Sequence, residues 1–116
     1  MGEPLRVLFV CSRNQWRSPT AARIYRADPR LAVRAAGLSE RSPRTLGVRD
    51  LAWAEVVLVM EPEQRRRLQQ RFGRKTELPA VHCLDVPDEY GFMDPELVTL
   101  LRASIEPALE PHLGSR

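Results

Sequence analysis

The sequence predicts an α/β fold, a three-layer sandwich in which a small four-stranded parallel sheet carries helices on both faces. Short apolar runs alternate with polar or amphipathic segments along the 116 residues. The runs are continuous and do not alternate with polar residues, which is typical of strands covered on both faces. Their β-α-β-α order implies right-handed crossovers and therefore a parallel sheet.

The first half of the chain supplies two strands and two helices. The first strand is the apolar run at 5–10, and Ser18-Pro19 then predicts a helix start, with Ser18 as N-cap and proline at the first helical position. A short second strand is expected at 31–37, ending on a glycine. A polar loop and a short amphipathic helix at 47–54 follow.

The second half repeats the alternation. The third strand is expected at 55–60, and Glu61-Pro62 opens a polar helix that ends at Phe72-Gly73. A fourth strand is expected at 79–86, and Asp94-Pro95 caps the last helix. The apolar positions of that helix fall on one stripe, which consists of Leu97, Leu100, Leu101, Ile105 and Leu109.

Length and composition predict a single domain over residues 1–116. With 43% hydrophobic residues, the chain can bury one core. The two cysteines, Cys11 and Cys83, form neither a disulfide framework nor a metal-binding cluster, so we expect reduced thiols, no metal and no cofactor. No apolar run approaches the roughly 18 residues that span a bilayer, and the N-terminus lacks a secretion signal. The expected location is the cytoplasm, without a membrane partner.

The charge of the chain favours an anionic partner. Of the 18 basic residues 17 are arginine, and the net charge is +3. This mild excess suits a phosphorylated protein or a small phosphomonoester. The arginines at 65–67 lie on a polar helix, and we interpret them as a solvated face rather than a nucleic-acid patch.

Four loops are predicted to meet at one edge of the sheet, at 11–18, 37–45, 60–62 and 85–94. The first contains "CSRNQWRSP", which runs from Cys11 to Pro19 directly after a buried strand. Successive backbone N–H groups in such a turn can form an anion nest, backed by the positive end of the following helix. The field that holds a phosphate also favours a thiolate at Cys11.

The side chains of this loop predict covalent phosphate chemistry. Arg17 offers a planar fork that binds two phosphoryl oxygens at once. Ser18 can donate a hydrogen bond to the sulfur, and Asn14 is the loop residue that best tolerates a left-handed backbone. We therefore expect Cys11 to attack a phosphate monoester and form a phosphocysteine, which water later hydrolyses. The competing interpretation is that Cys11 is a buried, inert core residue.

The stretch "VLFVCSRNQWRSPTA" resembles the active-site signature of the low-molecular-weight protein tyrosine phosphatases, a strand followed by Cys-x-Gly-Asn-x-Cys-Arg-Ser-Pro. The resemblance implies that Cys11 is the nucleophile, Arg17 the transition-state clamp, and Asn14 and Ser18 loop supports. It also implies a general acid in the last loop. Arg13 stands where the family has glycine, and Trp16 replaces its second cysteine. The segment between the second and third strands is also shorter than the family's.

The resemblance and the loop positions together give a set of site residues. The phosphate-binding set comprises the loop and one aromatic neighbour: Ser12, Arg13, Asn14, Gln15, Trp16, Ser18 and Tyr90. Candidates for the general acid are Asp85, Asp88, Glu89 and Asp94. We assign Asp88, because its spacing to Tyr90 resembles the family's Asp-Pro-Tyr-Tyr loop. Tyr90 is expected either to wall the substrate ring or to pack within its loop.

Two other functions remain open from the sequence. One is an arsenate reductase-like thiol enzyme, which requires further cysteines near the loop, and only Cys83 is available. The other is a phosphate- or nucleic-acid-binding module that keeps the loop without turnover.

Overall fold

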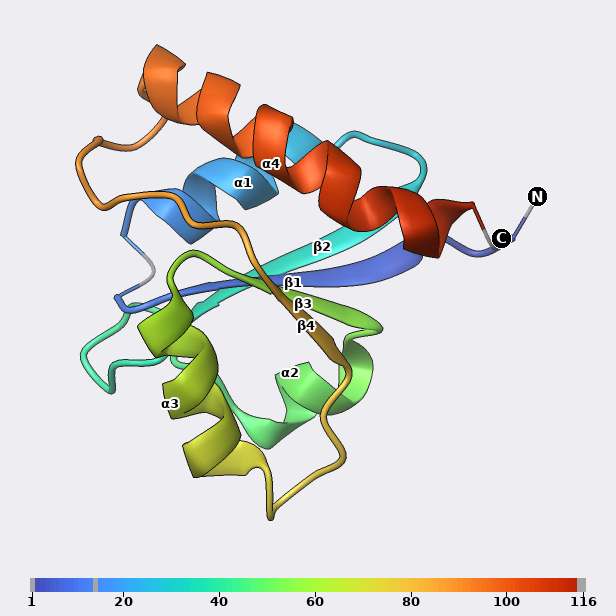
Figure 1. Cartoon of the computed structure of the whole chain (residues 1–116), viewed down its shortest axis with the longest axis vertical. Coiled ribbons are helices and arrows are strands. Elements are labelled where there is room, and N and C mark those ends of the chain that lie inside the picture. Colours follow the sequence, from blue (N-terminus) through green and yellow to red (C-terminus); the bar gives the residue numbers. More distant parts are fainter. Residues whose placement is uncertain (1, 14, 115–116) are drawn as a thin grey trace.

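The structure, a computed structural model, describes residues 2–13 and 15–114. The four strands found there form one parallel sheet: β1 (Leu5–Cys11), β2 (Leu31–Gly37), β3 (Val56–Val59) and β4 (Ala80–Cys83). The helices are α1 (Arg17–Tyr25), α2 (Val48–Trp53), α3 (Pro62–Phe72) and α4 (Pro95–Leu113). Strand order across the sheet is β2-β1-β3-β4 (Figure 1). The predicted α/β fold with a four-stranded parallel sheet is confirmed.

Alternate residues of β1 serve the two faces of the sheet. Val7 and Phe9 pack into the core cluster that includes residues of α1 and α4, and both are fully buried. Leu8 and Val10 pack into the cluster that includes residues of α2 and α3. Figure 1 shows α1 and α4 on one side of the sheet and α2 and α3 on the other. The continuous apolar run of β1 thus reflects burial on both faces.

The connections that follow the two central strands, β1 and β3, lead to opposite edges of the sheet. From β1 the chain passes through α1 to β2 at one side of the sheet, and from β3 it passes through α3 to β4 at the other. A crevice forms between such diverging loops, and α/β sheets bind their ligands there. The topology therefore predicts a ligand site between the segments that follow β1 and β3.

The start of α1 differs from the prediction. The N-cap is Trp16 rather than Ser18, and no side chain caps the helix. Ser18 lies inside the first turn and is fully buried, with its hydroxyl oxygen 2.9 Å from the sulfur of Cys11. The predicted cap was wrong because the helix begins at Arg17, one residue before Ser18, which places Ser18 inside the first turn.

The last helix confirms its predicted cap and most of its predicted stripe. Asp94 Oδ1 accepts a hydrogen bond of 2.9 Å from the N–H of Glu96. Leu97 and Leu101 are fully buried, whereas Leu100 is 38% exposed and was wrongly placed in the stripe. No helix in the described part of the chain is both long and apolar enough to cross a membrane.

Candidate active site

A small cavity of about 100 Å³ opens at the carboxyl end of β1. Residues of the 11–17 loop and one residue of the loop after β4 line it: Cys11, Ser12, Arg13, Gln15, Trp16, Arg17 and Asp88. We call this space the Cys11 cavity. All of its lining residues belong to the predicted site, and the fold brings them together from segments about seventy residues apart in the sequence.

The cysteine sits where the strand ends and is almost fully buried, with 3% of its surface exposed. Its sulfur lies 2.9 Å from Ser18 Oγ, and Ser18 has no exposed surface. When the sulfur is ionised, this hydroxyl acts as the donor, because a thiolate can only accept. Cys11 thus belongs to the core cluster of α1 and α4 and also lines the cavity, where its sulfur contacts a hydroxyl.

Backbone hydrogen bonds join the loop at 11–18 to the loop after β2. The carbonyl of Cys11 accepts from the N–H of Leu38 at 3.0 Å, and the carbonyl of Ser12 accepts from the N–H of Ser39 at 2.7 Å. In a trans peptide the N–H points away from its own carbonyl, so the N–H groups of Ser12 and Arg13 face away from the 38–42 segment. This orientation is the one that an anion nest requires.

Gly37 permits this close approach. A Cβ atom at Gly37 would lie 2.0 Å from Ser42 Oγ and 3.0 Å from the backbone carbon of Arg13. Ser42 in turn donates a 3.3 Å hydrogen bond to the carbonyl of Ser12. The glycine that ends the second strand therefore allows two loops to pack directly against each other.

Arg17 is buried, and its guanidinium is held from outside the cavity. Nη1 donates to Glu61 Oε2 at 2.8 Å and to the carbonyl of Val86 at 2.9 Å, while only 4% of the side chain is exposed. Both hydrogens of Nη1 are thus engaged. The remaining donors lie on Nε and Nη2, and this edge of the guanidinium can bind two phosphoryl oxygens in parallel.

Two residues of the crevice were missed by sequence reasoning. Gln64 is 99% buried: its Oε1 accepts from the N–H groups of Met60 and Glu61, at 2.8 and 3.0 Å, and its Nε2 donates to Ser12 Oγ at 3.2 Å. Glu61, which also accepts from Gln64 Nε2 at 3.1 Å, orients Arg17. The position of Glu61 directly after the third strand, in one of the four predicted loops, was the signal that could have found it.

Asp88 reaches the cavity on the loop at 84–94. Its Oδ1 lies 3.8 Å from Arg17 Nε, beside the guanidinium edge that does not contact Glu61 or Val86, and 58% of the side chain is exposed. The loop is fixed at both ends, since the N–H of Val86 donates to the carbonyl of Met60 at 2.9 Å and the N–H of Met93 donates to the buried Thr20 Oγ1 at 3.0 Å. Asp88 is therefore presented on an anchored segment.

The other candidate acids lie elsewhere. Asp85 is exposed and adopts a positive φ of 57°, a conformation that aspartate tolerates in turns. Asp94 caps α4, and Glu89 is exposed. None of the three lines the Cys11 cavity.

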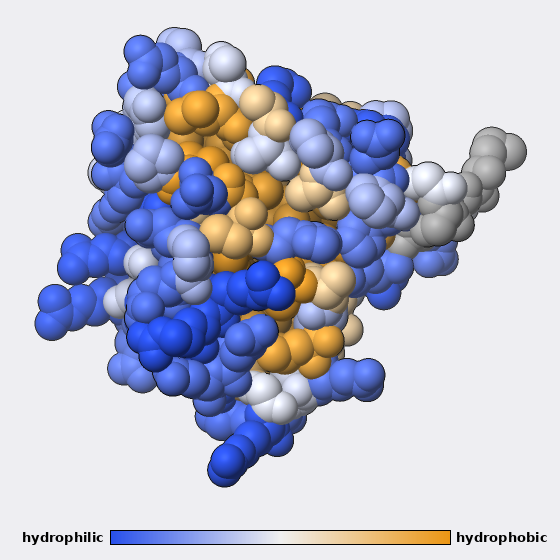
Figure 2. Space-filling view, in the orientation of Figure 1, coloured by the Kyte–Doolittle hydropathy of each residue, from blue (hydrophilic) through white to orange (hydrophobic). Residues whose placement is uncertain are grey.

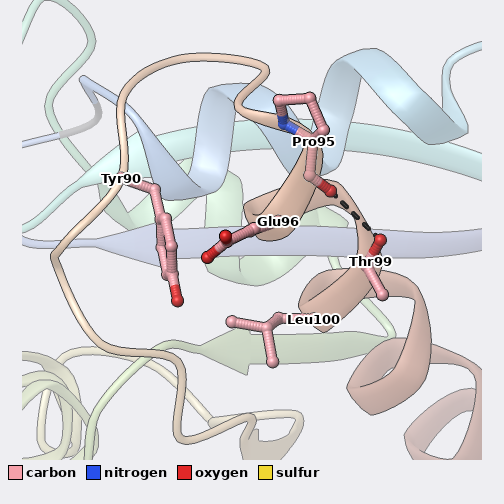
Figure 3. Close-up of a pocket in the computed structure, with 5 residues that line it drawn as sticks. All are labelled: Tyr90, Pro95, Glu96, Thr99 and Leu100. Carbon is pink, nitrogen blue, oxygen red and sulfur yellow. Dashed lines mark hydrogen bonds between the residues drawn. The ribbon is translucent and has the colours of Figure 1, made fainter.

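The structure places Tyr90 away from the predicted phosphate site. Its ring lines a second cavity, beside the first turns of α4, together with Pro95, Glu96, Thr99 and Leu100 (Figure 3). We call this space the α4 cavity. Trp16, 43% exposed, supplies the aromatic surface of the Cys11 cavity instead.

Asn14 was predicted to support the loop, but this residue lies outside the described part of the chain.

The chemistry available in the Cys11 cavity is that of a nucleophile beside an anion site. A sulfur, a hydroxyl donor, a guanidinium edge and a carboxylate converge there. Among the residues that the structure describes, no group of three or more His, Cys, Asp or Glu side chains could hold a metal ion.

Solved structures of phosphatases share this architecture. The YwlE arginine phosphatase from Geobacillus stearothermophilus aligns over 97% of this chain and 98% of its own, with a TM-score of 0.71 and 24% identity. The low-molecular-weight protein tyrosine phosphatase SP-PTP from Streptococcus pyogenes aligns over 92% of both chains, with a TM-score of 0.71 and 15% identity. This chain has the fold of the low-molecular-weight protein tyrosine phosphatases. Neither a family model nor a curated protein matches its sequence.

A third neighbour concerns the chemistry of that fold. A YwlE arginine phosphatase variant with cysteine replaced by serine, solved with its active-site serine phosphorylated, covers 91% of this chain and 96% of its own, at a TM-score of 0.64 and 21% identity. The match to the first neighbour extends over nearly the whole of both chains. The shortening predicted between the second and third strands stays a prediction.

Proposed function

We propose that this protein is a metal-independent phosphatase of the low-molecular-weight tyrosine phosphatase type, which acts on phosphorylated proteins or small phosphomonoesters. The observation that carries this proposal is the contact of 2.9 Å between Cys11 Sγ and Ser18 Oγ in a cavity that also holds Arg17. A buried sulfur with a hydroxyl donor and a guanidinium beside it is arranged for attack on phosphorus.

The proposed reaction has two steps. In the first, the Cys11 thiolate attacks phosphorus, the bond from phosphorus to the leaving oxygen breaks, and the Asp88 carboxyl group protonates that oxygen. In the second, water attacks the phosphocysteine, the sulfur–phosphorus bond breaks, and the Asp88 carboxylate takes the proton from water. The free edge of Arg17 holds two phosphoryl oxygens in both steps, and Ser18 donates to the departing sulfur.

The neighbouring structures support this proposal through their fold. One of them is a phosphatase with a phosphorylated serine in place of its cysteine, which is the covalent adduct expected when the attacking atom is an oxygen. Because the nucleophile must stay reduced, the proposal includes a cytoplasmic location.

The arsenate reductase-like alternative lacks a second thiol on the correct side of the sheet. Cys11 packs in the core cluster shared by α1 and α4, whereas Cys83 packs against the cluster shared by α2 and α3. A thiol relay would have to cross the sheet between them.

Replacement of Cys11 tests the covalent mechanism. We expect Cys11→Ser to reduce hydrolysis of an aryl phosphate to the rate of a buffer blank, because a serine hydroxyl is a far weaker nucleophile than a thiolate. The matched control is Cys83→Ser, which removes the other thiol and leaves the rate unchanged. Turnover that survives Cys11→Ser would eliminate the mechanism, and a wild-type protein without turnover would favour the phosphate-binding module.

Replacement of Asp88 tests the general acid. We expect Asp88→Asn to lower kcat/KM by about 10²-fold with an alkyl phosphate and far less with a nitrophenyl phosphate, whose leaving group needs no proton. The neighbouring change Glu89→Gln removes the same charge and serves as control. Equal losses for both leaving groups would remove Asp88 from this role.

A further inference from the structure

The α4 cavity has no part in the chemistry proposed above. It encloses about 370 Å³ between the loop at 84–94 and the first two turns of α4. Figure 3 shows the Tyr90 and Glu96 side chains converging there from the loop and the helix, with Leu100 one turn further along.

The walls of this cavity are mainly apolar. The Tyr90 ring, the Pro95 ring and Leu100 provide them, and Leu100 is 38% exposed although its neighbour Leu101 is fully buried. Single exposed leucines need no explanation, but Met93 is also exposed on the adjoining loop. The exposed Phe92 lines a different cavity, together with residues of α1 and β2. Figure 2 shows apolar surface on the face where this loop and α4 lie. Such a cluster favours binding of an apolar group.

The polar groups of the cavity are acidic. Glu96 supplies a carboxylate, and the cavity lining contains no basic side chain. The pKa of Tyr90 is raised by burial and then by nearby carboxylates, which belong to Glu96, Glu89 and Asp94. Thr99 does not compete for a ligand, because its hydroxyl already donates to the carbonyl of Pro95 at 3.1 Å. The position of Glu96 in the first turn of α4 suits the helix dipole, but the dipole does not account for the apolar walls.

The α4 cavity lies within reach of the Cys11 cavity. Asp88 lines one and Tyr90 lines the other. Two residues of extended chain span at most about 7 Å, so the Cα atoms of these two lining residues lie within that distance, although their side chains enter different cavities. A peptide whose phosphorylated residue enters the Cys11 cavity can reach the α4 cavity with a side chain one to three positions away.

We propose that the α4 cavity binds a lysine or arginine side chain of the phosphorylated protein substrate. The methylene stem of such a side chain covers Leu100 and Pro95, and its cationic head meets the Glu96 carboxylate and the face of the Tyr90 ring. An acidic side chain is repelled, and a purely apolar one adds no charged partner to the carboxylate, which already lies beside the Tyr90 hydroxyl. This inference rests on the proposed phosphatase function and specifies its substrate.

The test uses phosphotyrosine peptides that differ at one position. Lysine, norleucine or glutamate is placed one to three residues on either side of the phosphotyrosine, and kcat/KM is measured. We expect lysine to exceed glutamate by about three- to tenfold at one or more positions, an effect typical of a partly exposed charge pair. High salt should reduce the difference.

Two variants test whether the preference for lysine peptides depends on the α4 cavity. Glu96→Gln should abolish the lysine preference, whereas Glu110→Gln, which removes the same charge from an exposed position near the other end of α4, should preserve it. Both variants should hydrolyse aryl phosphate at the wild-type rate. A preference that persists in Glu96→Gln, or norleucine peptides that match the lysine peptides, would overturn the inference.

A failure of the phosphatase proposal is distinguishable from a failure of this inference. If the wild-type protein hydrolyses neither aryl phosphate nor peptides, the phosphatase proposal fails, and binding of labelled lysine and glutamate peptides is measured by fluorescence anisotropy. Tighter binding of the lysine peptide that is lost in Glu96→Gln supports the inference. Equal binding of the two peptides overturns it.

Discussion

The Cys11 cavity and the α4 cavity share the loop at 84–94, but they are constructed differently. The first is about 100 Å³ in volume, and its lining includes exposed residues as well as the buried Cys11 and Arg17. Hydrogen bonds hold Arg17 to Glu61 and Val86, and the buried Gln64 to Ser12. The second is about 370 Å³ in volume, and its walls are exposed or half-exposed side chains. Chemistry on phosphorus needs groups held within fractions of an ångström, whereas recognition of a flexible side chain tolerates looser walls.

Among the three substitutions that compare the two cavities, we expect the largest loss of activity from a change that disturbs the fixed geometry of the Cys11 cavity. Arg17→Lys should lower kcat/KM for aryl phosphate by about 10²–10³-fold, because an ammonium cannot contact Glu61, the carbonyl of Val86 and two phosphoryl oxygens together. The exposed residue Arg23 on the same helix provides the control, as Arg23→Lys should leave the rate unchanged. A loss of less than fivefold in Arg17→Lys would mean that the guanidinium fork is not needed.

We expect a smaller loss of activity from replacement of Gln64, which supports the Cys11 cavity through hydrogen bonds without lining it. Gln64→Leu leaves the N–H groups of Met60 and Glu61 without their acceptor and Ser12 without a donor, so we expect a loss of about 1–3 kcal/mol in the free energy of unfolding. Activity should fall by about tenfold or more as the loop shifts. Urea denaturation and aryl phosphate kinetics measure both. The same change at the exposed Gln69 should have neither effect, and equal losses at both positions would contradict the role of Gln64.

The smallest expected effect belongs to the α4 cavity. Leu100→Ala should change the free energy of unfolding by no more than about 0.5 kcal/mol, since the side chain is already partly exposed. Its buried neighbour offers a contrast, as Leu101→Ala should cost about 2–5 kcal/mol. Thermal or urea denaturation compares the two. A large loss in Leu100→Ala would show that this leucine belongs to the core and does not serve a binding surface.

The features that the sequence predicts are those that depend on residues close together in the chain. The strands and the Cys11 loop were predictable because each depends on a local pattern, an apolar run or a short motif such as Cys11 to Pro19. Glu61 and Gln64 were not assigned, because their contacts with Arg17 and Ser12 link residues 44 and 52 positions apart.

Two local patterns also gave wrong predictions. Ser18-Pro19 has the form of a helix cap, but the helix begins at Arg17, and the serine hydroxyl lies 2.9 Å from the sulfur of Cys11. Leu100 follows the helical spacing of the buried stripe, yet 38% of its surface is exposed. Periodicity gives the face of a helix only to within one residue on either side, and tertiary contacts determine where the stripe ends.

The hydrogen bond between Arg17 and the carbonyl of Val86 is made by a main-chain atom. Replacement of side chains in the loop at 84–94 does not remove such an acceptor, provided that the backbone path is kept. Positions 87, 89, 91 and 92 could therefore be randomised in a library while the guanidinium stays clamped. New substrate preferences could be selected on this loop without rebuilding the reaction centre.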